Sequence, residues 1–255
     1  MADWLDRCHF GDCRDLLPMI PAGVADAVIA DPPYGDTSLK WDRVVDGWIE
    51  ACARTLKPVG SIWVFGSLRF IAPTFDLMKR AGFIYSQDIV WRKQNGSGFN
   101  NDRFRRVHEH AVLFYRGAWS DVYKCPQVTH DAKARTVRQS ANRAAHTGSV
   151  GEAIYRSVAG GPRFRTSVLD IRNEHGRAVH PTQKPVDLVE LLVRYSVPPG
   201  GIVLDPFLGS GSTALAAIRN SRHWIGCEID SDCRDIQTQR LQQEPLVLEI
   251  QGDTR

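Results

Sequence analysis

The tetrapeptide Asp31-Pro32-Pro33-Tyr34 combines a carboxylate, a rigid diproline and an aromatic ring. It follows a short apolar stretch, residues 25–30, of the kind that forms a buried strand, and two prolines end a strand. The Asp31 carboxylate and the Pro32 carbonyl can accept the two N–H bonds of an exocyclic base amine, while Pro33 stiffens the loop. Tyr34 offers a flat face for an extruded base. These four residues are therefore the predicted catalytic residues for group transfer to an amine.

A second group, residues 204–213, has the pattern of a strand, a tight glycine turn and a helix start. Gly209 and Gly211 let the backbone approach a ligand where a Cβ would clash. Glu228 ends the next predicted strand, where a carboxylate can accept hydrogen bonds from both hydroxyls of a ribose. Together these features predict a nucleoside cofactor. The spacing Gly209-x-Gly211-x-x-Ala214 also fits the dinucleotide fingerprint, so an NAD-linked oxidoreductase is an alternative at this point.

Strands and helices alternate around both groups. Apolar runs predict the strands, and amphipathic spacing predicts the helices between them. This alternation is typical of an α/β fold with a mostly parallel sheet that helices cover on both faces. The predicted strands are residues 25–30, 61–66, 83–91, 111–115, 201–204 and 224–228, and the predicted helices are residues 47–56, residues 70–81 with Pro73 in the first turn, and two that begin at residues 185 and 213. Residues 116–178 show no clear periodicity.

The composition indicates which cellular compartment and which partners to expect. Hydrophobic residues make up 43% and charged residues 24% of its 255 residues, which is ordinary for a globular protein. The sequence shows no apolar run of membrane-spanning length and no secretory signal, and its six cysteines include no C-x-x-C pair. We therefore expect a cytoplasmic protein with reduced cysteines, no metal and no membrane partner. His108 and His110 flank Glu109, but a third ligand is missing, so we interpret them as structural or DNA-facing.

Charge is unevenly distributed along the chain. The net charge is +3, yet residues 92–177 contain 16 Lys and Arg against 7 Asp and Glu, a local charge of +9. The rest of the chain carries −6. Arginine-rich surfaces bind phosphates well, so this segment is a predicted nucleic-acid face set into an acidic scaffold. A merely solvated surface is the alternative.

Five segments of the sequence resemble the motifs of the DNA amino-methyltransferases. Their order is similar to that of the permuted group, in which the catalytic motif precedes the cofactor motif. The segments are residues 10–13 with Leu16 and Leu17, residues 31–34, residues 180–185, residues 205–213 and residues 226–230. The resemblance implies a Rossmann-like methyltransferase fold with a mostly parallel seven-stranded sheet, helices on both faces and one antiparallel strand near an edge. It also implies a catalytic half at residues 1–116, a target-recognition insertion at residues 117–178 and a cofactor-binding half at residues 179–255.

The resemblance also implies that the cofactor is S-adenosylmethionine. Asp12 and the Cys13 backbone would contact its adenine, and Glu228 would contact its ribose. A segment at residues 180–184 would close over the methionine end, where Lys184 can pair with the carboxylate. The predicted cofactor-binding residues are Asp12, Cys13, His180, Thr182, Lys184, Asp205, Phe207, Gly209, Gly211, Ser212, Thr213 and Glu228.

The substrate that the resemblance implies is double-stranded DNA with a flipped-out target base. In this family, an aspartate in the position of Asp31 favours the N6 amine of adenine over the N4 amine of cytosine. The predicted DNA-binding residues are Arg103, Arg105, Arg106, Arg135, Arg138, Arg143, Arg163 and Arg165. The small recognition region favours a homodimer. A catalytically idle DNA-binding module and a methyltransferase of RNA or protein are further alternatives, and the sequence leaves open both the recognition site and whether the setting is a restriction system, a phage or regulation.

Overall fold

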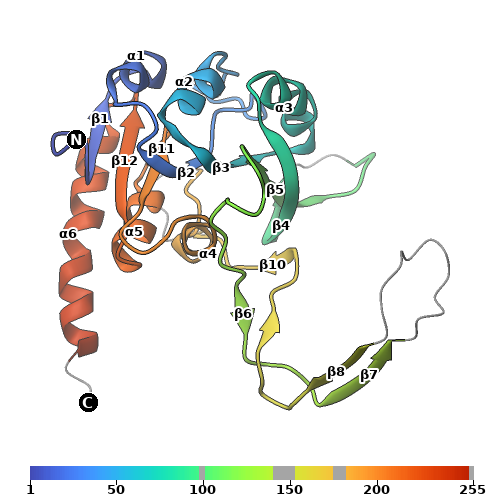
Figure 1. Ribbon diagram of the computed structural model, residues 1–255. Coiled ribbons are helices and arrows are strands. Elements are labelled where there is room, and N and C mark those ends of the chain that lie inside the picture. The colour runs from blue at the N-terminus through green and yellow to red at the C-terminus, as the bar shows by residue number, and fades with distance from the viewer. Residues whose placement is uncertain (98–100, 140–152, 175–181, 253–255) are drawn as a thin grey trace. The chain divides into compact units, whose positions relative to one another are not determined.

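A computed structural model describes residues 1–97, 101–139, 153–174 and 182–252 of the chain (Figure 1). The chain forms two compact units. The large unit comprises Met1–Cys125 and Ser167–Arg255, and the small unit comprises Pro126–Thr166. The large unit holds an α/β sheet, and the small unit holds two short antiparallel ribbons.

The large unit is built on an eight-stranded sheet in the order β1-β12-β11-β2-β3-β5-β4-β10. Neighbouring strands are parallel except where β5 pairs with β3 and β4. The strands are β1 (Arg7–Phe10), β2 (Ala25–Ala30), β3 (Leu56–Gly66), β4 (Ile84–Ser97), β5 (Arg106–Tyr115), β10 (Val168–Asp170), β11 (Ile202–Asp205) and β12 (His223–Glu228). The predicted mostly parallel α/β sheet is confirmed. The sheet has eight strands where the resemblance implied seven, and the sequence pattern missed β1 and β10, whose four and three residues are too few to leave a readable pattern.

Both faces of the sheet carry hydrophobic side chains. Successive residues of a strand point to opposite sides, so one apolar strand contributes to two cores. In β2, Ala27 and Ile29 belong to one core, and Val28 and Ala30 belong to the other. Helices α4 (Val186–Ser196) and α5 (Ser212–Arg219) contribute to the first core. The second core takes residues from α1 (Cys13–Leu16), the 3-10 helix η1 (Leu17–Met19), α2 (Trp48–Thr55) and α3 (Leu68–Arg80). Helix α6 (Cys233–Gly252) follows β12.

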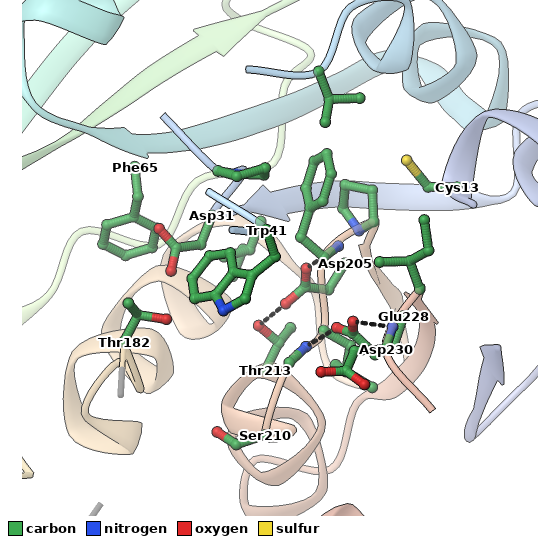
Figure 2. A pocket seen from close by; sticks show the side chains of 18 of the residues that line it. Cys13, Asp31, Trp41, Phe65, Thr182, Asp205, Ser210, Thr213, Glu228 and Asp230 are labelled. Atoms are coloured by element: carbon green, nitrogen blue, oxygen red, sulfur yellow. Dashed lines mark hydrogen bonds between the residues drawn. The ribbon is translucent and has the colours of Figure 1, made fainter. Parts of the chain in front are cut away.

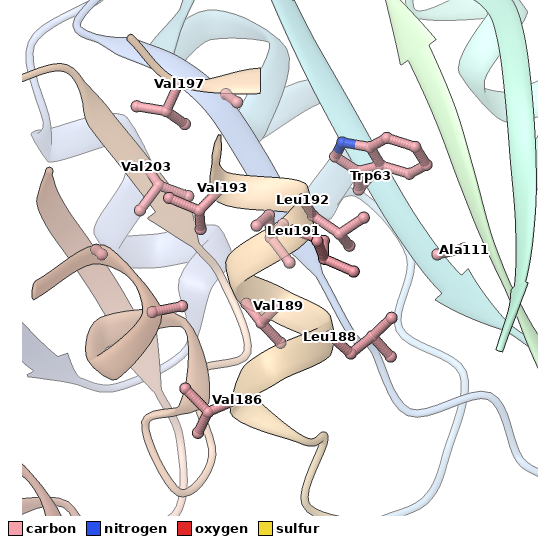
Figure 3. Close-up of a cluster of buried hydrophobic side chains, with 14 of the residues drawn as sticks. Trp63, Ala111, Val186, Leu188, Val189, Leu191, Leu192, Val193, Val197 and Val203 are labelled. Atoms are coloured by element: carbon pink, nitrogen blue, oxygen red, sulfur yellow. The ribbon is translucent and has the colours of Figure 1, made fainter. Parts of the chain in front are cut away.

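Helix α4 is the element that fixes the segment before it against the sheet. Figure 3 shows its apolar face packed toward the central strands. Leu188 and Val193 are fully buried, and the Trp63 indole donates a hydrogen bond of 2.7 Å to Ser196 Oγ. Truncating such a buried leucine typically costs about 2–5 kcal/mol. Lys184 lies two residues before this well-anchored helix, so its backbone has a defined position.

Several predicted elements differ in their bounds, and the strand predicted at residues 61–66 is β3, which begins at Leu56. Helix α3 begins at Leu68, so the prediction that Pro73 lies in its first turn is wrong: Pro73 lies inside the helix and has no N–H to give to the preceding turn. The neighbouring Thr74 hydroxyl donates to the Phe70 carbonyl at 2.7 Å. Strands β4 and β5 extend beyond their predicted apolar parts, because polar residues continue the ladder between them as far as Ser97 and Arg106.

The small unit has two antiparallel ribbons. Strand β6 (Val128–Thr129) pairs with β9 (Arg163–Phe164), and β7 (Arg135–Gln139) pairs with β8 (Ala153–Ser157). Among its described side chains, Ala132 is the one in the buried class. Tyr155 and Phe164 are exposed. The unit therefore presents most of its described side chains to solvent.

The carboxyl ends of five parallel strands meet at one edge of the large sheet. Asp12 lies two residues beyond β1, and Asp31 follows β2 directly. Asp205 and Glu228 are the last residues of β11 and β12. In open α/β sheets this edge is where ligands bind. The topology therefore collects four acidic residues from distant parts of the chain in the expected ligand crevice.

Candidate active site

A cavity of about 500 Å³ opens at this edge of the large unit (Figure 2). Small-molecule sites typically occupy about 300–1,000 Å³, so the cavity suits a nucleoside-sized ligand. The predicted site residues that line it are Asp12, Cys13, Asp31, Pro33, Thr182, Lys184, Asp205, Phe207, Gly209, Ser212, Thr213 and Glu228. Pro32, Tyr34 and Gly211 lie beside these residues in the chain and not in the lining. His180 lies outside the described residues.

Asp31 is held in place through both of its carboxylate oxygens. The Tyr34 hydroxyl donates a hydrogen bond of 3.1 Å to Oδ1, and Lys184 Nζ donates one of 2.5 Å to Oδ2. The Tyr34 ring lies against Phe70, with 5.5 Å between ring centroids. Burial raises the pKa of Asp31, and the positive charge of Lys184 opposes that rise. The loop after β2 therefore carries an oriented carboxylate whose oxygens can each accept a further hydrogen bond.

The Lys184 ammonium group lies among acidic and aromatic groups of the protein, including the Phe65 ring at 5.3 Å from its centroid. Its ammonium group lies 2.5 Å from Asp31, 3.3 Å from the Tyr34 hydroxyl and 3.4 Å from Glu109. Its own carbonyl accepts a hydrogen bond of 2.8 Å from Ser212 Oγ, which ties the segment to the start of α5. No local sequence pattern predicts the pairing of Lys184 with Asp31, and a contact of Lys184 with the cofactor carboxylate stays a prediction.

The glycine loop adopts the backbone conformation that its glycines allow. Gly209 and Gly211 have φ angles of +53° and +87°, a region that favours glycine, and Gly211 is the N-cap of α5. Asp205 stabilises the loop, because its carboxylate accepts hydrogen bonds from Phe207 N at 2.9 Å and from Thr213 Oγ1 at 2.6 Å. Burial raises the pKa of Asp205 to about 7. Asp205 therefore shapes the loop, and the loop backbone faces the cavity.

Glu228 lies on the cavity wall with both oxygens engaged. Oε2 accepts a hydrogen bond of 2.6 Å from Gly209 N, and Oε1 accepts one of 2.8 Å from Asp230 N. The Gly209 carbonyl is held in turn by the Gln237 amide at 2.6 Å. A carboxylate oxygen can accept more than one hydrogen bond, so Glu228 retains the capacity to accept from ribose hydroxyls.

Asp12 and Cys13 line the cavity beside Glu228, because β1 pairs with β12. Asp12 is the N-cap of α1: Oδ1 accepts a hydrogen bond of 2.9 Å from Arg14 N, and Oδ2 pairs with the Arg14 guanidinium at 2.6 Å. The hydrogen bonds from Arg14 lower the pKa of Asp12. Burial raises the pKa of the Cys13 thiol to about 12, so it is neutral at physiological pH. A thiolate nucleophile at Cys13 is therefore disfavoured.

Several lining residues are not among the predicted site residues, and Trp41 and Phe65 are two of them. The Trp41 indole is 46% exposed and projects into the cavity between Asp31 and Thr213 (Figure 2). Its loop is fixed by the buried Asp42, which accepts hydrogen bonds from the backbone of Gly35 and Thr37 at 2.8 and 2.7 Å. The available signal was a lone tryptophan in a polar segment without helical or strand periodicity.

The predicted DNA-binding arginines fall into two groups. Arg103, Arg105 and Arg106 are exposed and lie before or at the start of β5, where Arg106 pairs with Asp36 of the loop after β2 at 2.9 Å. Arg135, Arg163 and Arg165 are exposed on the small unit. The side chain of Arg138 and all of Arg143 lie outside the described residues. Within the part of the chain that the structure describes, no cluster of three metal-binding side chains is found.

A nucleoside-sized cavity with acidic residues at the carboxyl ends of parallel strands is typical of an enzyme that uses a nucleoside cofactor. The chain belongs to the DNA methylase family, whose model matches residues 25–239. It is 30% identical to the type II methyltransferase M.HinfI of Haemophilus influenzae and to the type II methyltransferase M.BglII of Bacillus subtilis. Both alignments cover 94% of this chain, and they cover 69% and 70% of those proteins.

Solved structures agree with this assignment. The M1.HpyAVI–SAM complex aligns with a TM-score of 0.65 at 25% identity, over 92% of this chain and 98% of that one. The cytosine-N4-specific PvuII DNA methyltransferase aligns with a TM-score of 0.63 over 91% of this chain and 84% of that one, and at 18% identity it supports the fold alone.

The chain is therefore a DNA methyltransferase of the N6/N4 class, and its methyl donor is S-adenosylmethionine. The Rossmann-like methyltransferase fold is confirmed. The family assignment excludes the NAD-linked oxidoreductase that the glycine spacing had left open. None of the helices in the described ranges is both long and apolar enough to cross a membrane.

Proposed function

We propose that the chain methylates the N6 amine of adenine at specific sites in double-stranded DNA. The position of Asp31 carries this proposal: its carboxylate lies on the cavity wall, oriented by Tyr34 and Lys184. An aromatic amine is a weak nucleophile, because its lone pair is delocalised into the ring. A carboxylate that accepts an N–H bond localises that lone pair on nitrogen and prepares it for attack.

The cavity residues fit S-adenosylmethionine. Glu228 has acceptor capacity for the ribose, Asp12 and Cys13 border the space for its adenine, and the loop from Phe207 to Thr213 borders the space for its amino acid part. Thr182 and Lys184 line the same cavity beside Asp31. When bound, the cofactor supplies an electrophilic methyl group on a sulfonium. The protein has to hold that group in line with the amine nitrogen, at the 3–3.5 Å typical of a near-attack arrangement.

Four side chains or backbone groups act on the target base in this proposal. Asp31 accepts one amine N–H, the Pro32 carbonyl accepts the other, and Pro33 keeps the loop rigid. Tyr34 orients Asp31 with its hydroxyl, and its ring offers a stacking face. The exposed indole of Trp41 offers a second flat surface inside the cavity. The amine loses a proton on methylation, and Asp31 is placed to accept it.

Adenine is favoured over cytosine by the residue type at position 31. In the family that the sequence resembles, an aspartate at this position accompanies adenine N6 more often than cytosine N4. Asp31 also provides a charged acceptor, held by a lysine, for both N–H polarisation and proton uptake. N4-methylation of cytosine uses the same geometry and is the alternative outcome of the test below.

DNA is proposed to contact the two arginine groups. Arg103 and Arg105 are exposed next to the strand whose first residue, Arg106, pairs with the catalytic loop. The arginines of the small unit would contact phosphates or guanine edges as part of a target-recognition region at residues 117–178. We further propose that the enzyme acts as a homodimer. Mass measurement in solution, with and without a DNA duplex, tests that part separately.

Transfer of labelled methyl from S-adenosylmethionine to unmethylated genomic DNA, followed by nucleoside analysis, tests the proposal. The expected product is N6-methyladenine. N4-methylcytosine would retain the enzyme class and refute the assignment to adenine. Matched reactions with RNA and with protein would reveal another acceptor. An Asp31→Ala variant that binds DNA and transfers no label excludes a contaminating methyltransferase.

A further inference from the structure

Four charged side chains from distant parts of the sequence form one cluster beside the cavity. Lys184 Nζ lies 2.5 Å from Asp31 Oδ2 and 3.4 Å from Glu109 Oε2. Lys93 Nζ contacts the other oxygen of Glu109, Oε1. One ammonium group thus joins the two carboxylates, and a second ammonium group balances Glu109.

Burial makes this cluster costly unless its charges remain paired. Glu109 is 9% exposed and Lys184 is 7% exposed. Removing charged groups from water is unfavourable unless partners compensate their charges. Two positive and two negative groups compensate here. Because Lys184 would already be neutralised by Asp31 alone, the presence of Glu109 and Lys93 calls for a separate explanation.

The antiparallel direction of β5 places Glu109 at the edge of the sheet where the cavity lies. It lies near the start of the antiparallel strand β5, next to His110, which pairs with Gly66 at the carboxyl end of β3. Lys93 lies on the neighbouring strand β4. Adjacent residues of a strand point to opposite faces, so His110 is directed away from Glu109 and toward Asp88, at 3.6 Å. In the His-Glu-His sequence, the central glutamate is therefore the residue that reaches the site.

We propose that Glu109 is a positioning residue for Asp31 and acts through Lys184. This inference rests on the proposed role of Asp31 as acceptor of the target amine. Held between two carboxylates, the ammonium group has one defined position, and it fixes the Asp31 carboxylate by a short hydrogen bond. Glu109 also takes a share of the positive charge. Asp31 therefore remains a strong acceptor instead of being fully neutralised by the lysine.

The charges that face each group support this division of roles. Asp31 faces Lys184, Glu109, Tyr34 and, more remotely, Asp205. Burial raises the pKa of Asp31, Lys184 opposes the rise, and the negative charge of Glu109 adds to it.

Glu109 itself faces the two lysines of the cluster, with His108 next to it on the same strand. Burial opposes its ionisation, but Lys184 and Lys93 together lower the pKa of Glu109 to about 2. Glu109 is thus a constant negative charge over the whole working range of pH.

Two single variants should shift the acid limb of the rate–pH profile in opposite directions. Glu109→Gln keeps the shape and removes the charge, so the pKa of Asp31 falls and the acid limb of the rate–pH profile moves to lower pH. Lys93→Met leaves an excess negative charge, so the limb moves to higher pH. The maximal rate of Glu109→Gln should fall roughly 10- to 100-fold, because Asp31 is less well oriented.

A double variant separates the effect of the Glu109 charge from a loss of folding. Glu109→Gln alone leaves a buried positive charge in excess, whereas Lys93→Met with Glu109→Gln restores a neutral Asp31–Lys184 pair. We expect the double variant to fold and to keep its acid limb below that of the unaltered chain. Glu109→Asp should recover part of the rate. Glu50→Gln, an exposed change on α2, is the matched control.

The experiment measures single-turnover methylation of a DNA duplex from pH 5 to pH 9, with saturating S-adenosylmethionine, and cofactor affinity by calorimetry. Opposite shifts of the acid limb with cofactor affinity unchanged would support the positioning role. Acid limbs that coincide with that of the unaltered chain would overturn it, as would a rate loss that follows cofactor affinity and thermal stability. Absence of any transfer by the unaltered chain would instead refute the proposed function.

Discussion

The cavity edge of the large sheet and the small unit differ in how their charged side chains are held. At the edge, Asp31 and Glu228 each accept two hydrogen bonds from named partners and have one geometry. On the small unit, Arg163 and its partner Asp131 are both more than half exposed and lie 3.3 Å apart. Solvent screens an exposed ion pair, which therefore contributes little to stability, whereas a buried carboxylate is fixed by its surroundings. Single changes should therefore be severe at the edge and mild on the small unit.

The largest effect is expected at Asp31. Asp31→Asn preserves size and removes the negative acceptor, so the rate of methyl transfer should fall about 100- to 10,000-fold, the range associated with loss of a group that handles protons in the transition state. Cofactor affinity should change little, because Lys184 keeps Glu109 as a partner. Single-turnover assays and calorimetry measure both quantities. Asp76→Asn, an exposed change on α3, should leave the rate unaltered.

The pH dependence should carry the same signature. A protonated Asp31 can no longer accept the amine N–H, so activity falls as pH falls through its pKa. Burial raises that pKa above the usual value of an aspartate. The acid limb should therefore lie at a higher pH than an ordinary exposed aspartate would give. A limb at the position of an ordinary aspartate would argue against the buried, lysine-held carboxylate described above.

Glu228 should give the next largest effect, and in a different quantity. Glu228→Ala removes the ribose acceptor and releases the N–H groups of Gly209 and Asp230. Hydrogen bonds to a charged group contribute about 1.5–3 kcal/mol, so the Kd for S-adenosylmethionine should rise roughly 10- to 100-fold. The rate at saturating cofactor should change much less. Calorimetry on this variant and on Asp235→Asn, an exposed neighbour, separates the specific effect from a general one.

The small unit should respond weakly and in proportion to charge. Removing Arg163 or Arg165 should weaken DNA binding a few-fold and reduce the slope of log K against log salt by about one for each lost phosphate contact. The methylation rate at saturating DNA should stay unchanged. Fluorescence anisotropy at several salt concentrations checks this, with Arg80→Ala on α3 as control. A variant of either arginine that abolishes transfer at saturating DNA would break the contrast between the two regions.

The smallest effect is expected from the cysteines. Because burial raises the pKa of Cys13 to about 12, its thiol should react slowly with iodoacetamide at pH 8. The exposed Cys125 should be alkylated first, with methyl transfer retained. Peptide mass spectrometry identifies the modified residue. Activity lost in step with modification of Cys125 would contradict the assignment of that residue to a position outside the active site.

The positions of the short segments that directly follow strands could be predicted from the sequence. The tetrapeptide comes directly after β2, the glycine loop follows β11, and Glu228 ends β12, so periodicity and turn chemistry were sufficient to predict them. The Asp31–Lys184 pair joins residues 153 positions apart, and no local pattern encodes it. The role of Glu109 could not be predicted either, since its partners depend on how β4 and β5 pair. Trp41 lies in a loop, where side-chain direction has no period to reveal it.

The most direct test of the central claim is single-molecule sequencing of DNA from cells that lack adenine methylation and express this chain, beside cells that express Asp31→Asn. The account predicts N6-methyladenine at one short recurring sequence in the first sample and none in the second. N4-methylcytosine at that sequence, or N6-methyladenine that persists with Asp31→Asn, would contradict the claim that Asp31 directs methyl transfer to adenine.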